Sequence, residues 1–223
     1  MRGIELLGKH DVQWNAMAVV NNLNVEHPLE FYRFFRDTLN CRFLQFTPIV
    51  ERYDTSGMLV AGLHDGGKLT AISVTAEQWG RFLCEIFDEW VRNDVGEMFI
   101  QLFDATLANW CGVQPSLCAF GEVCGDGLVV EHNGDVYSCD HFVYPDYLLG
   151  NIKEKSLAEI YASKERFRFG LDKRNTLPRE CLGCRYYFAC RGECPKHRFD
   201  RGADGEPKNT LCEGLYRYFA HTA

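Results

Sequence analysis

The positions of the cysteines constrain this chain more than any other feature. Eight of its eleven cysteines fall into two groups in the C-terminal half, namely Cys118, Cys124 and Cys139, followed by Cys181, Cys184, Cys190, Cys194 and, after a longer gap, Cys212. Thiolates are ligands that select iron–sulfur clusters, zinc or copper(I). The short gaps in the second group let one loop place several sulfurs around one centre. Eight thiolates make two complete four-thiolate sites, so we expect the C-terminal half to fold around metal.

The spacing alone does not decide which metal is bound. A disulfide framework suits a short secreted chain with an even number of cysteines, whereas this chain has 223 residues and an odd number. Four-cysteine sites serve zinc and iron–sulfur clusters equally well. Zinc ribbons usually show two matched Cys-x2-Cys pairs, and this sequence has one, at Cys181 and Cys184. Zinc and iron–sulfur therefore both remain open at this level.

Composition excludes several classes of partner. The net charge of −7 and the pI of about 5.5 argue against a nucleic-acid surface, which would be basic. No stretch approaches the roughly 18 consecutive apolar residues of a membrane span. The first ten residues lack the apolar stretch of a secretory signal, so we expect a cytoplasmic protein. The three remaining cysteines, Cys41, Cys84 and Cys111, lie in or beside predicted strands and helices, which indicates buried thiols.

The N-terminal half shows the pattern of an α/β protein. The apolar run at residues 13–21 predicts a strand that is buried on both faces, as in a parallel sheet. Pro28 suits the first turn of a helix, and residues 42–50 predict a second buried strand. Strand, helix and strand form a βαβ unit, which builds parallel sheets and barrels. The glycine-containing stretch 51–73 is expected to be a long loop.

Further elements follow from capping and periodicity. Thr75 and Gln78 predict a capping box, followed by a helix whose apolar stripe belongs to the core. The remaining expected elements are a helix over 95–110, a hairpin of strands 128–131 and 136–139, a helix over 156–169 and a short helix over 211–218. Periodic segments give way to short cysteine-containing pieces near residue 112, where we place a domain boundary.

The cysteine series resembles the SPASM domain, a C-terminal extension with two iron–sulfur clusters in a class of radical S-adenosylmethionine (radical SAM) enzymes. The runs Tyr137-Ser-Cys-Asp-His-Phe142, Leu149-Gly-Asn-Ile152 and Asn15-Ala-Met-Ala-Val-Val-Asn21 narrow the match. Together they are similar to the anaerobic sulfatase-maturating enzymes. This resemblance implies an α/β fold in which residues 1–111 form the C-terminal part of a partial (β/α)6 TIM-like barrel. Residues 112–223 would then be a SPASM domain with two auxiliary [4Fe–4S] clusters.

The resemblance also implies roles for individual residues. Enzymes of this family oxidise a cysteine or serine of a sulfatase to Cα-formylglycine: a 5′-deoxyadenosyl radical removes a Cβ hydrogen, a base takes the thiol or hydroxyl proton, and an electron leaves. Asp140 matches the base. Without the resemblance, Asp140 would be read as a hairpin-end aspartate that accepts backbone N–H bonds. The implied ligands are Cys118, Cys124, Cys139 and Cys194 for one cluster, and Cys181, Cys184, Cys190 and Cys212 for the other.

One motif of the family is missing from the sequence. Radical SAM chemistry needs a third cluster on Cys-x3-Cys-x2-Cys, and the nearest run here is Cys190-x3-Cys194-x2-His197. The family carries that motif after its first barrel strand, so we expect this chain to begin near the fifth and to be inactive alone. The chain would be a fragment, the partner of a separate N-terminal radical SAM half, or a non-catalytic iron–sulfur or zinc peptide-binding module. A sheet begun midway exposes a strand edge, which argues against the module.

The substrate class has one further alternative. Other SPASM-bearing radical SAM enzymes crosslink small peptides, but the aspartate that follows Cys139 favours the sulfatase type. We therefore expect a sulfatase polypeptide as the substrate. The sequence leaves open whether its target residue is a cysteine or a serine.

Overall fold

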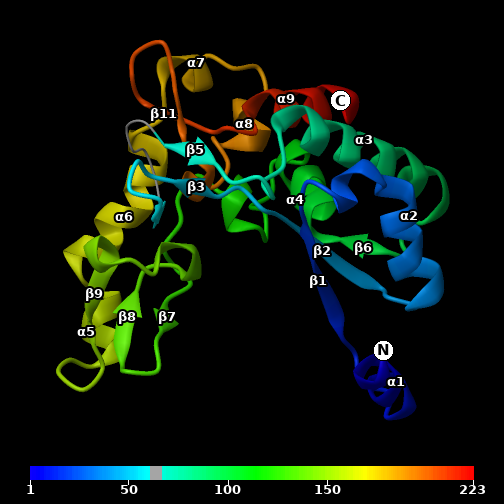
Figure 1. The fold of residues 1–223 in the computed structure, drawn as a ribbon, viewed down its shortest axis with the longest axis horizontal. Helices are drawn as coiled ribbons and strands as arrows, with labels where there is room; N and C mark the ends of the chain where they lie inside the picture. The colour runs from blue at the N-terminus through cyan, green and yellow to red at the C-terminus, as the bar shows by residue number, and fades with distance from the viewer. Residues whose placement is uncertain (61–66) are drawn as a thin grey trace. The chain divides into compact units, whose positions relative to one another are not determined.

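The computed structural model describes residues 1–60 and 67–223, which form two compact units (Figure 1). The first unit comprises residues 1–51, 69–117 and 211–223, and the second comprises residues 52–68 and 118–210. The expected division into domains 1–111 and 112–223 stays a prediction. No helix among the described residues is long and apolar enough to cross a membrane.

A parallel sheet organises the first unit. Strands β1 (Asn15–Val20), β2 (Phe43–Pro48) and β6 (Phe99–Ile100) lie in the order β1-β2-β6, and both pairs are parallel. Asn15 lies opposite Phe43, which sets the register of β1 on β2. The connection between them contains the helix α2 (Pro28–Arg33), which continues as the π-helix η2 (Phe34–Thr38). The predicted βαβ unit is therefore confirmed.

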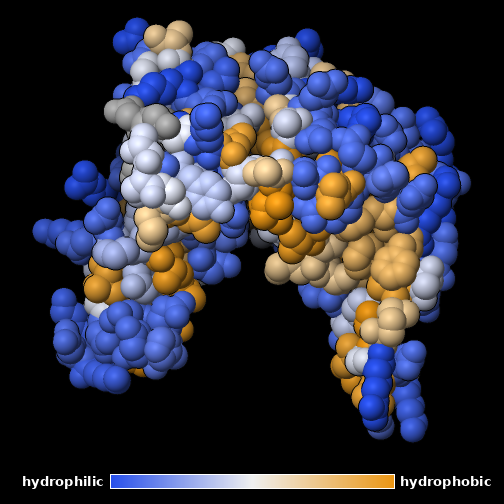
Figure 2. Space-filling model, in the orientation of Figure 1, coloured by the Kyte–Doolittle hydropathy of each residue, from blue (hydrophilic) through white to orange (hydrophobic). Residues whose placement is uncertain are grey.

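The prediction that the first strand is buried on both faces was wrong. In β1, Ala18 and Val20 are buried, but Met17 is 68% exposed and Val19 is 50% exposed. Apolar side chains gather over this region in Figure 2. Residues 16–20 are apolar at every position, so periodicity could not distinguish the covered face from the open one. An additional helix, α1 (Arg2–Lys9), precedes the strand and has no buried residue.

Two further helices of the first unit pack against each other. Helix α3 (Ala76–Asn93) begins at Thr75, whose side chain accepts a hydrogen bond from the Gln78 backbone in the predicted capping box. Most of its stripe, including Trp79 and Phe82, is buried as expected, but Val91 near its C-terminal end is 45% exposed. Helix α9 (Cys212–His221) packs along α3. The helix predicted over 95–110 begins only at residue 101, as α4 (Gln101–Trp110), because residues 99–100 pair with β2 as strand β6.

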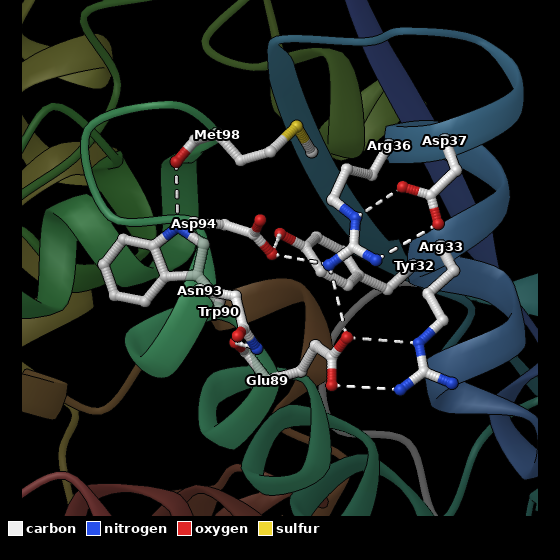
Figure 3. A network of polar contacts seen from close by, with 9 residues as sticks. All are labelled: Tyr32, Arg33, Arg36, Asp37, Glu89, Trp90, Asn93, Asp94 and Met98. Carbon is white, nitrogen blue, oxygen red and sulfur yellow. Dashed lines mark hydrogen bonds and ion pairs between the residues drawn. The ribbon is translucent and has the colours of Figure 1, made fainter.

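A polar network ties the α2–η2 segment to the end of α3 (Figure 3). The buried hydroxyl of Tyr32 donates to Asp94 at 2.8 Å, and the Arg36 guanidinium reaches the same carboxylate at 2.8 Å. Glu89 accepts from Arg36 and, through both of its oxygens, from Arg33. Burial and the bond to Asp94 raise the pKa of Tyr32 far above its usual value, so the phenol stays protonated. This network fixes the βαβ connection against α3.

The second unit contains short elements around a hairpin. Strands β7 (Val129–Val130) and β8 (Asp135–Tyr137) form the predicted hairpin, with Gly134 at a φ of +95° in its turn. Strand β9 (Leu148–Asn151) pairs with β8. The expected helix over 156–169 is interrupted, because Ser163 caps a new helix. The other elements are α5 (Leu157–Tyr161), α6 (Lys164–Asn175), α7 (Arg179–Leu182), α8 (Tyr187–Cys190), and the short strand pair β10 (Asp200–Arg201) and β11 (Pro207–Lys208).

The expected loop over 51–73 is partly ordered as strands. β3 (Arg52–Tyr53), β4 (Leu59–Val60) and β5 (Lys68–Leu69) form a small sheet in the order β4-β3-β5. Residues 61–66 of that expected loop, including Gly62 and Gly66, lie outside the described residues.

Candidate metal centre and catalytic site

Four cysteines of the second unit are brought within electrostatic reach of one another. Cys118 opens the short 3-10 helix η3 (Cys118–Phe120), and Cys139 follows strand β8 after one residue. Cys194 directly precedes another short helix, η6 (Pro195–His197). Cys118 acts on Cys124, on Cys139 and on Cys194, and Cys139 also acts on Cys194. These are the four residues that the family resemblance assigned to one cluster, although Cys194 is 55 residues from Cys139 in sequence.

Three thiols of this group, Cys124, Cys139 and Cys194, have raised pKa values and therefore lose their protons less readily than a free cysteine. Burial is the main cause that raises the pKa of Cys124 to about 11 and that of Cys139 to about 12. Nearby charges and hydrogen bonds have smaller effects in both directions. Burial and the Glu193 carboxylate raise the pKa of Cys194 well above its usual value. A bound metal deprotonates a coordinating thiol outright. The group is therefore electrostatically suited to a cationic occupant rather than to free thiolates.

A buried lysine shapes the loop that carries Cys118. Lys173 of α6 is 1% exposed, and its ammonium donates to the backbone carbonyls of Cys118, Ala119 and Gly121. An ammonium has three hydrogens, and each is used here. One side chain thus fixes the curvature of the loop from which the first ligand projects.

The second group of cysteines lies on short helices. Cys181 is in α7, Cys184 follows it, and Cys190 ends α8. Three consecutive residues after Cys190 have left-handed backbones: Arg191 (φ 50°), Gly192 (φ 74°) and Glu193 (φ 49°). This tight turn separates Cys190 from Cys194. Cys212 belongs to the first unit, where it begins α9.

Asp140 begins the short helix η4 (Asp140–Phe142) and is exposed. The Cys139 thiol donates to its Oδ1 over 3.3 Å. In the described part of the chain, its carboxylate accepts no backbone N–H, so the hairpin-brace interpretation of Asp140 finds no support there. The neighbouring His141 places Nδ1 3.7 Å from Cys194 Sγ. Asp140 and His141 are thus adjacent polar groups that touch two of the four clustered cysteines.

The donor set can be compared with the metals that the sequence left open. All eleven cysteines, each within the described residues, are unbridged by disulfides. Among those residues no three His, Cys, Asp or Glu side chains converge on a single ion. A zinc site needs four such ligands at about 2.3 Å from one point. An iron–sulfur cluster instead places its thiolates on separate irons, so a wider set of cysteine sulfurs fits it.

Other residues singled out in the sequence lie elsewhere. Cys41 and Cys84 are buried as predicted, but Cys111 is exposed, because α4 ends just before it. A cavity of about 540 Å³ includes Gln45 and Asp104 among its lining residues and lies at the N-terminal ends of β1 and β2. Barrel enzymes carry their chemistry at the opposite, C-terminal ends of the strands. The cavity is therefore not assigned to the site.

Sequence reasoning missed two buried cations near the cysteines, Lys173 and Arg198. Both are residue types that usually lie in solvent, and neither falls in an apolar pattern.

Comparison with known proteins identifies the relatives of this chain. Residues 118–185 match the family model of the SPASM iron–sulfur cluster-binding domain. Over its whole length the chain is 55% identical to a serine-type anaerobic sulfatase-maturating enzyme of Bacteroides thetaiotaomicron and covers 55% of that protein. This chain is homologous to the anaerobic sulfatase-maturating enzymes. It spans about half the length of the curated relatives that it matches.

Two further members of this group are more distant. A cysteine-type anaerobic sulfatase-maturating enzyme of Clostridium novyi is 28% identical over 98% of this chain, which covers 56% of that enzyme. The solved structure of native anSMEcpe with bound AdoMet and the Cp18Cys peptide superposes with a TM-score of 0.81. At 24% identity, the superposition covers 99% of this chain and 58% of that one. The chain therefore has the fold found in the sulfatase-maturating enzymes, with a SPASM domain.

Proposed function

We propose that this chain is the C-terminal part of an anaerobic sulfatase maturase, which oxidises a sulfatase side chain to Cα-formylglycine by radical SAM chemistry. Its first unit would complete a partial (β/α)6 barrel and its second would carry auxiliary [4Fe–4S] clusters. The observation that carries this proposal is the group of Cys118, Cys124, Cys139 and Cys194, with exposed Asp140 in contact with Cys139. An exposed carboxylate would then lie directly beside the cluster that these cysteines would hold.

The reaction defines what the chain's residues must do. A serine side chain becomes an aldehyde by losing one hydrogen atom from Cβ, one proton from the hydroxyl and one electron. AdoMet and the clusters, when bound, would supply the radical that takes the hydrogen atom and the acceptor for the electron. The proton is left for a protein base. Asp140 is exposed, and a carboxylate oxygen in this position could accept that proton.

The contact between Asp140 and Cys139 links the base to the metal site. The Cys139 thiol donates to Oδ1 of Asp140. A coordinating thiol loses its proton, so this hydrogen bond cannot persist once the site is loaded. The Oδ1 atom of Asp140 is then free to accept a proton from the substrate. We infer that a loaded metal site is a condition for Asp140 to act as a base.

The remaining assignments follow from the family's cysteine series. Cys118, Cys124, Cys139 and Cys194 would hold one cluster, and Cys181, Cys184, Cys190 and Cys212 the other. AdoMet and a third cluster would be held by sequence outside this chain, because the chain lacks Cys-x3-Cys-x2-Cys. A sulfatase polypeptide would be the substrate; anSMEcpe has been crystallised with a peptide. A cytoplasmic location stays a prediction.

The target residue of the substrate is proposed to be serine. The chain is 55% identical to a serine-type enzyme and 28% identical to a cysteine-type enzyme over almost the same length. A serine hydroxyl holds its proton more tightly than a cysteine thiol, whose pKa is about 8.5. Serine-type maturation therefore depends more strongly on a well-placed base such as Asp140.

A substrate comparison tests the proposed function. The chain would be joined to the AdoMet-binding half of the Bacteroides relative, loaded with iron and sulfide without oxygen, and given AdoMet with a reductant. Matched sulfatase peptides with serine or cysteine at the target would be followed by mass spectrometry. We expect loss of two hydrogens from the serine peptide. AdoMet cleavage with a fully loaded protein and no formylglycine from either peptide would overturn the proposal.

A further inference from the structure

Arg198 is a buried cation whose hydrogen-bonding capacity is largely unused. It is 2% exposed, and its Nη1 donates to the Thr176 hydroxyl over a long 3.5 Å. Its Nε and Nη2 are fully buried and have no hydrogen-bond partner among the described residues. A guanidinium has five N–H hydrogens, and leaving several of them unpaired in the interior is costly. Such a residue indicates a ligand that its donors are placed to meet.

The surroundings of Arg198 identify the chemistry of that ligand. Burial lowers the pKa of Arg198, while Glu193 and the sulfurs of Cys194, Cys181 and Cys124 act to raise it. Cys124 and Cys194 belong to the first group of cysteines, and Cys181 belongs to the second. The buried cation therefore lies within electrostatic reach of both groups. Three of the four groups that act to raise its pKa are cysteine sulfurs.

Glu193 does not neutralise Arg198 by contact. The Glu193 carboxylate is buried and accepts from His197 Nδ1 at 2.9 Å and from Asn209 Nδ2 at 2.5 Å. Burial alone would raise its pKa, but His197 and these hydrogen bonds hold it below its usual value. It shares no hydrogen bond with Arg198 among those in the described part of the chain. Glu193 therefore leaves the Nε and Nη2 donors of Arg198 without an acceptor.

The backbone makes room for this side chain at Gly192. A Cβ on Gly192 would lie 3.0 Å from Nη2 of Arg198 and would collide with the Leu177 side chain. Gly192 has a φ of 74° and lies between Cys190 and Cys194. The turn that separates these two cysteines thus leaves the space in which the Nη2 end of Arg198 lies.

Lys173 provides the contrast that separates the two cations. Its ammonium donates all three hydrogens to the carbonyls of Cys118, Ala119 and Gly121, so Lys173 stabilises the backbone of that loop. Arg198 makes one long contact and keeps the donors of Nε and Nη2. A cluster on four thiolates carries net negative charge, and hydrogen bonds to its sulfurs together with nearby charge set its reduction potential.

We propose that Arg198 sets the reduction potential of the auxiliary cluster held by Cys124 and Cys194, by donating from Nε and Nη2 to its sulfur atoms. Positive charge and donated hydrogen bonds stabilise the more negative, reduced form of the cluster. Arg198 therefore raises the potential and makes this cluster a better acceptor for the electron that leaves the substrate. This inference rests on the proposed function for the presence of clusters.

A reductive titration of the anaerobically loaded chain, followed by electron paramagnetic resonance, tests the proposal. In Arg198→Gln we expect full iron content and a lower midpoint potential for one cluster, because the positive charge and the paired N–H donors of the guanidinium are lost. Arg198→Lys keeps the positive charge but not the paired N–H donors, so the midpoint potential of the cluster should fall less than in Arg198→Gln. Arg174→Gln removes an exposed arginine from α6 that pairs with Glu122, and should titrate like the parent because water screens its charge.

The outcomes separate this inference from the proposed function. A parent chain that takes up no iron would overturn the proposed function. If Arg198→Gln takes up iron and keeps the parental potentials, the proposed role of Arg198 is overturned while the proposed function stands. If Arg198→Gln takes up no iron, the same conclusion follows from an iron-loaded Arg198→Lys with parental potentials. A measurement on the parent needs no variant: arginine labelled with nitrogen-15 in the guanidinium should show magnetic coupling to a reduced cluster. Absence of that coupling would also overturn the proposal.

Discussion

Gly80 of α3 and Gly214 of α9 bring the two helices into backbone contact: a Cβ on Gly80 would lie 2.7 Å from the Gly214 Cα. A Cβ on Gly214 would in turn collide with the Ala76 carbonyl. No other residue type fits at either position without separating the helices. Cys212, a proposed cluster ligand, begins α9 two residues before Gly214. The α3–α9 contact therefore fixes the position of a ligand within the first unit.

Replacing Gly80 by alanine tests this contact. We expect the free energy of unfolding to fall by about 1–3 kcal/mol, the usual cost of overpacking a tight contact. Gly8→Ala is the matched control, because a Cβ on Gly8 has nothing within 4 Å and alanine favours a helix. Urea denaturation of both variants measures the difference. Equal stability of Gly80→Ala and the parent would contradict the close approach.

Lys173→Met should destabilise the loop that carries Cys118. The substitution leaves three carbonyls without their common donor, so we expect a loss of about 2–4 kcal/mol in unfolding free energy. Iron content should fall by up to half, because only one of two clusters depends on this loop. Arg174→Met, at the next position of α6 but exposed, is the control. If both variants have the same unfolding free energy and the same iron content, the hydrogen bonds from Lys173 to this loop do not stabilise it.

The three cysteines outside the two groups should differ in reactivity. Cys111 is exposed and should react with iodoacetamide within minutes in the loaded protein. Burial raises the pKa of Cys41 and of Cys84, so both carry less thiolate than a free cysteine at pH 8 and should react slowly. Raising the pH should increase their thiolate fraction and their rate. Peptide mapping by mass spectrometry identifies each site; rapid labelling of Cys84 would argue against its burial.

Iron content tests the division of the eight ligands. Anaerobically loaded protein should be brown and contain about eight irons, the content of two [4Fe–4S] clusters. Cys184→Ala should retain about half of that iron, whereas Cys111→Ala should retain all of it. Metal analysis and the absorbance near 400 nm give both numbers. Colourless protein with stoichiometric zinc would instead support the zinc alternative.

Asp140→Asn isolates the proposed base. Asparagine keeps the size of aspartate but cannot accept a proton at neutral pH. In a protein that also contains the AdoMet-binding half, the variant should keep its iron and still cleave AdoMet. Formylglycine formation should slow by a factor on the order of 10² to 10⁴, the usual contribution of a positioned base. A fully loaded variant that matures the serine peptide at the parental rate would exclude Asp140 from this role.

Local signals predicted most of the fold. The Thr75 capping box, the α3 stripe and the Asn-Gly hairpin all follow from residues close together in sequence, and the structure contains all three. Strand β6 was missed because two residues carry no periodicity and its pairing with β2 is a tertiary event. The exposed face of β1 was missed for a related reason: an apolar run does not record which of its faces has a neighbour.

The candidate site was predictable only in part. Cysteine spacing predicted eight ligands as a set, because coordination restricts residue type and local distance, and that assignment stays a prediction. Spacing could not group Cys194 with Cys139, since the fold brings them within electrostatic reach. Arg198 and Lys173 were invisible for a different reason. Lys173 donates to carbonyls of a segment more than 50 residues away, and the cysteines that act electrostatically on Arg198 come from several segments.

The clamp formed by Lys173 has a consequence for damage by oxygen. Exposed iron–sulfur centres are lost on oxidation, and a site that collapses afterwards must be rebuilt from an unfolded loop. Here the curvature around Cys118 is maintained by a protein ammonium rather than by iron. The emptied loop should therefore keep its shape, so that iron and sulfide can be reinserted in place after an aerobic episode without refolding of the chain.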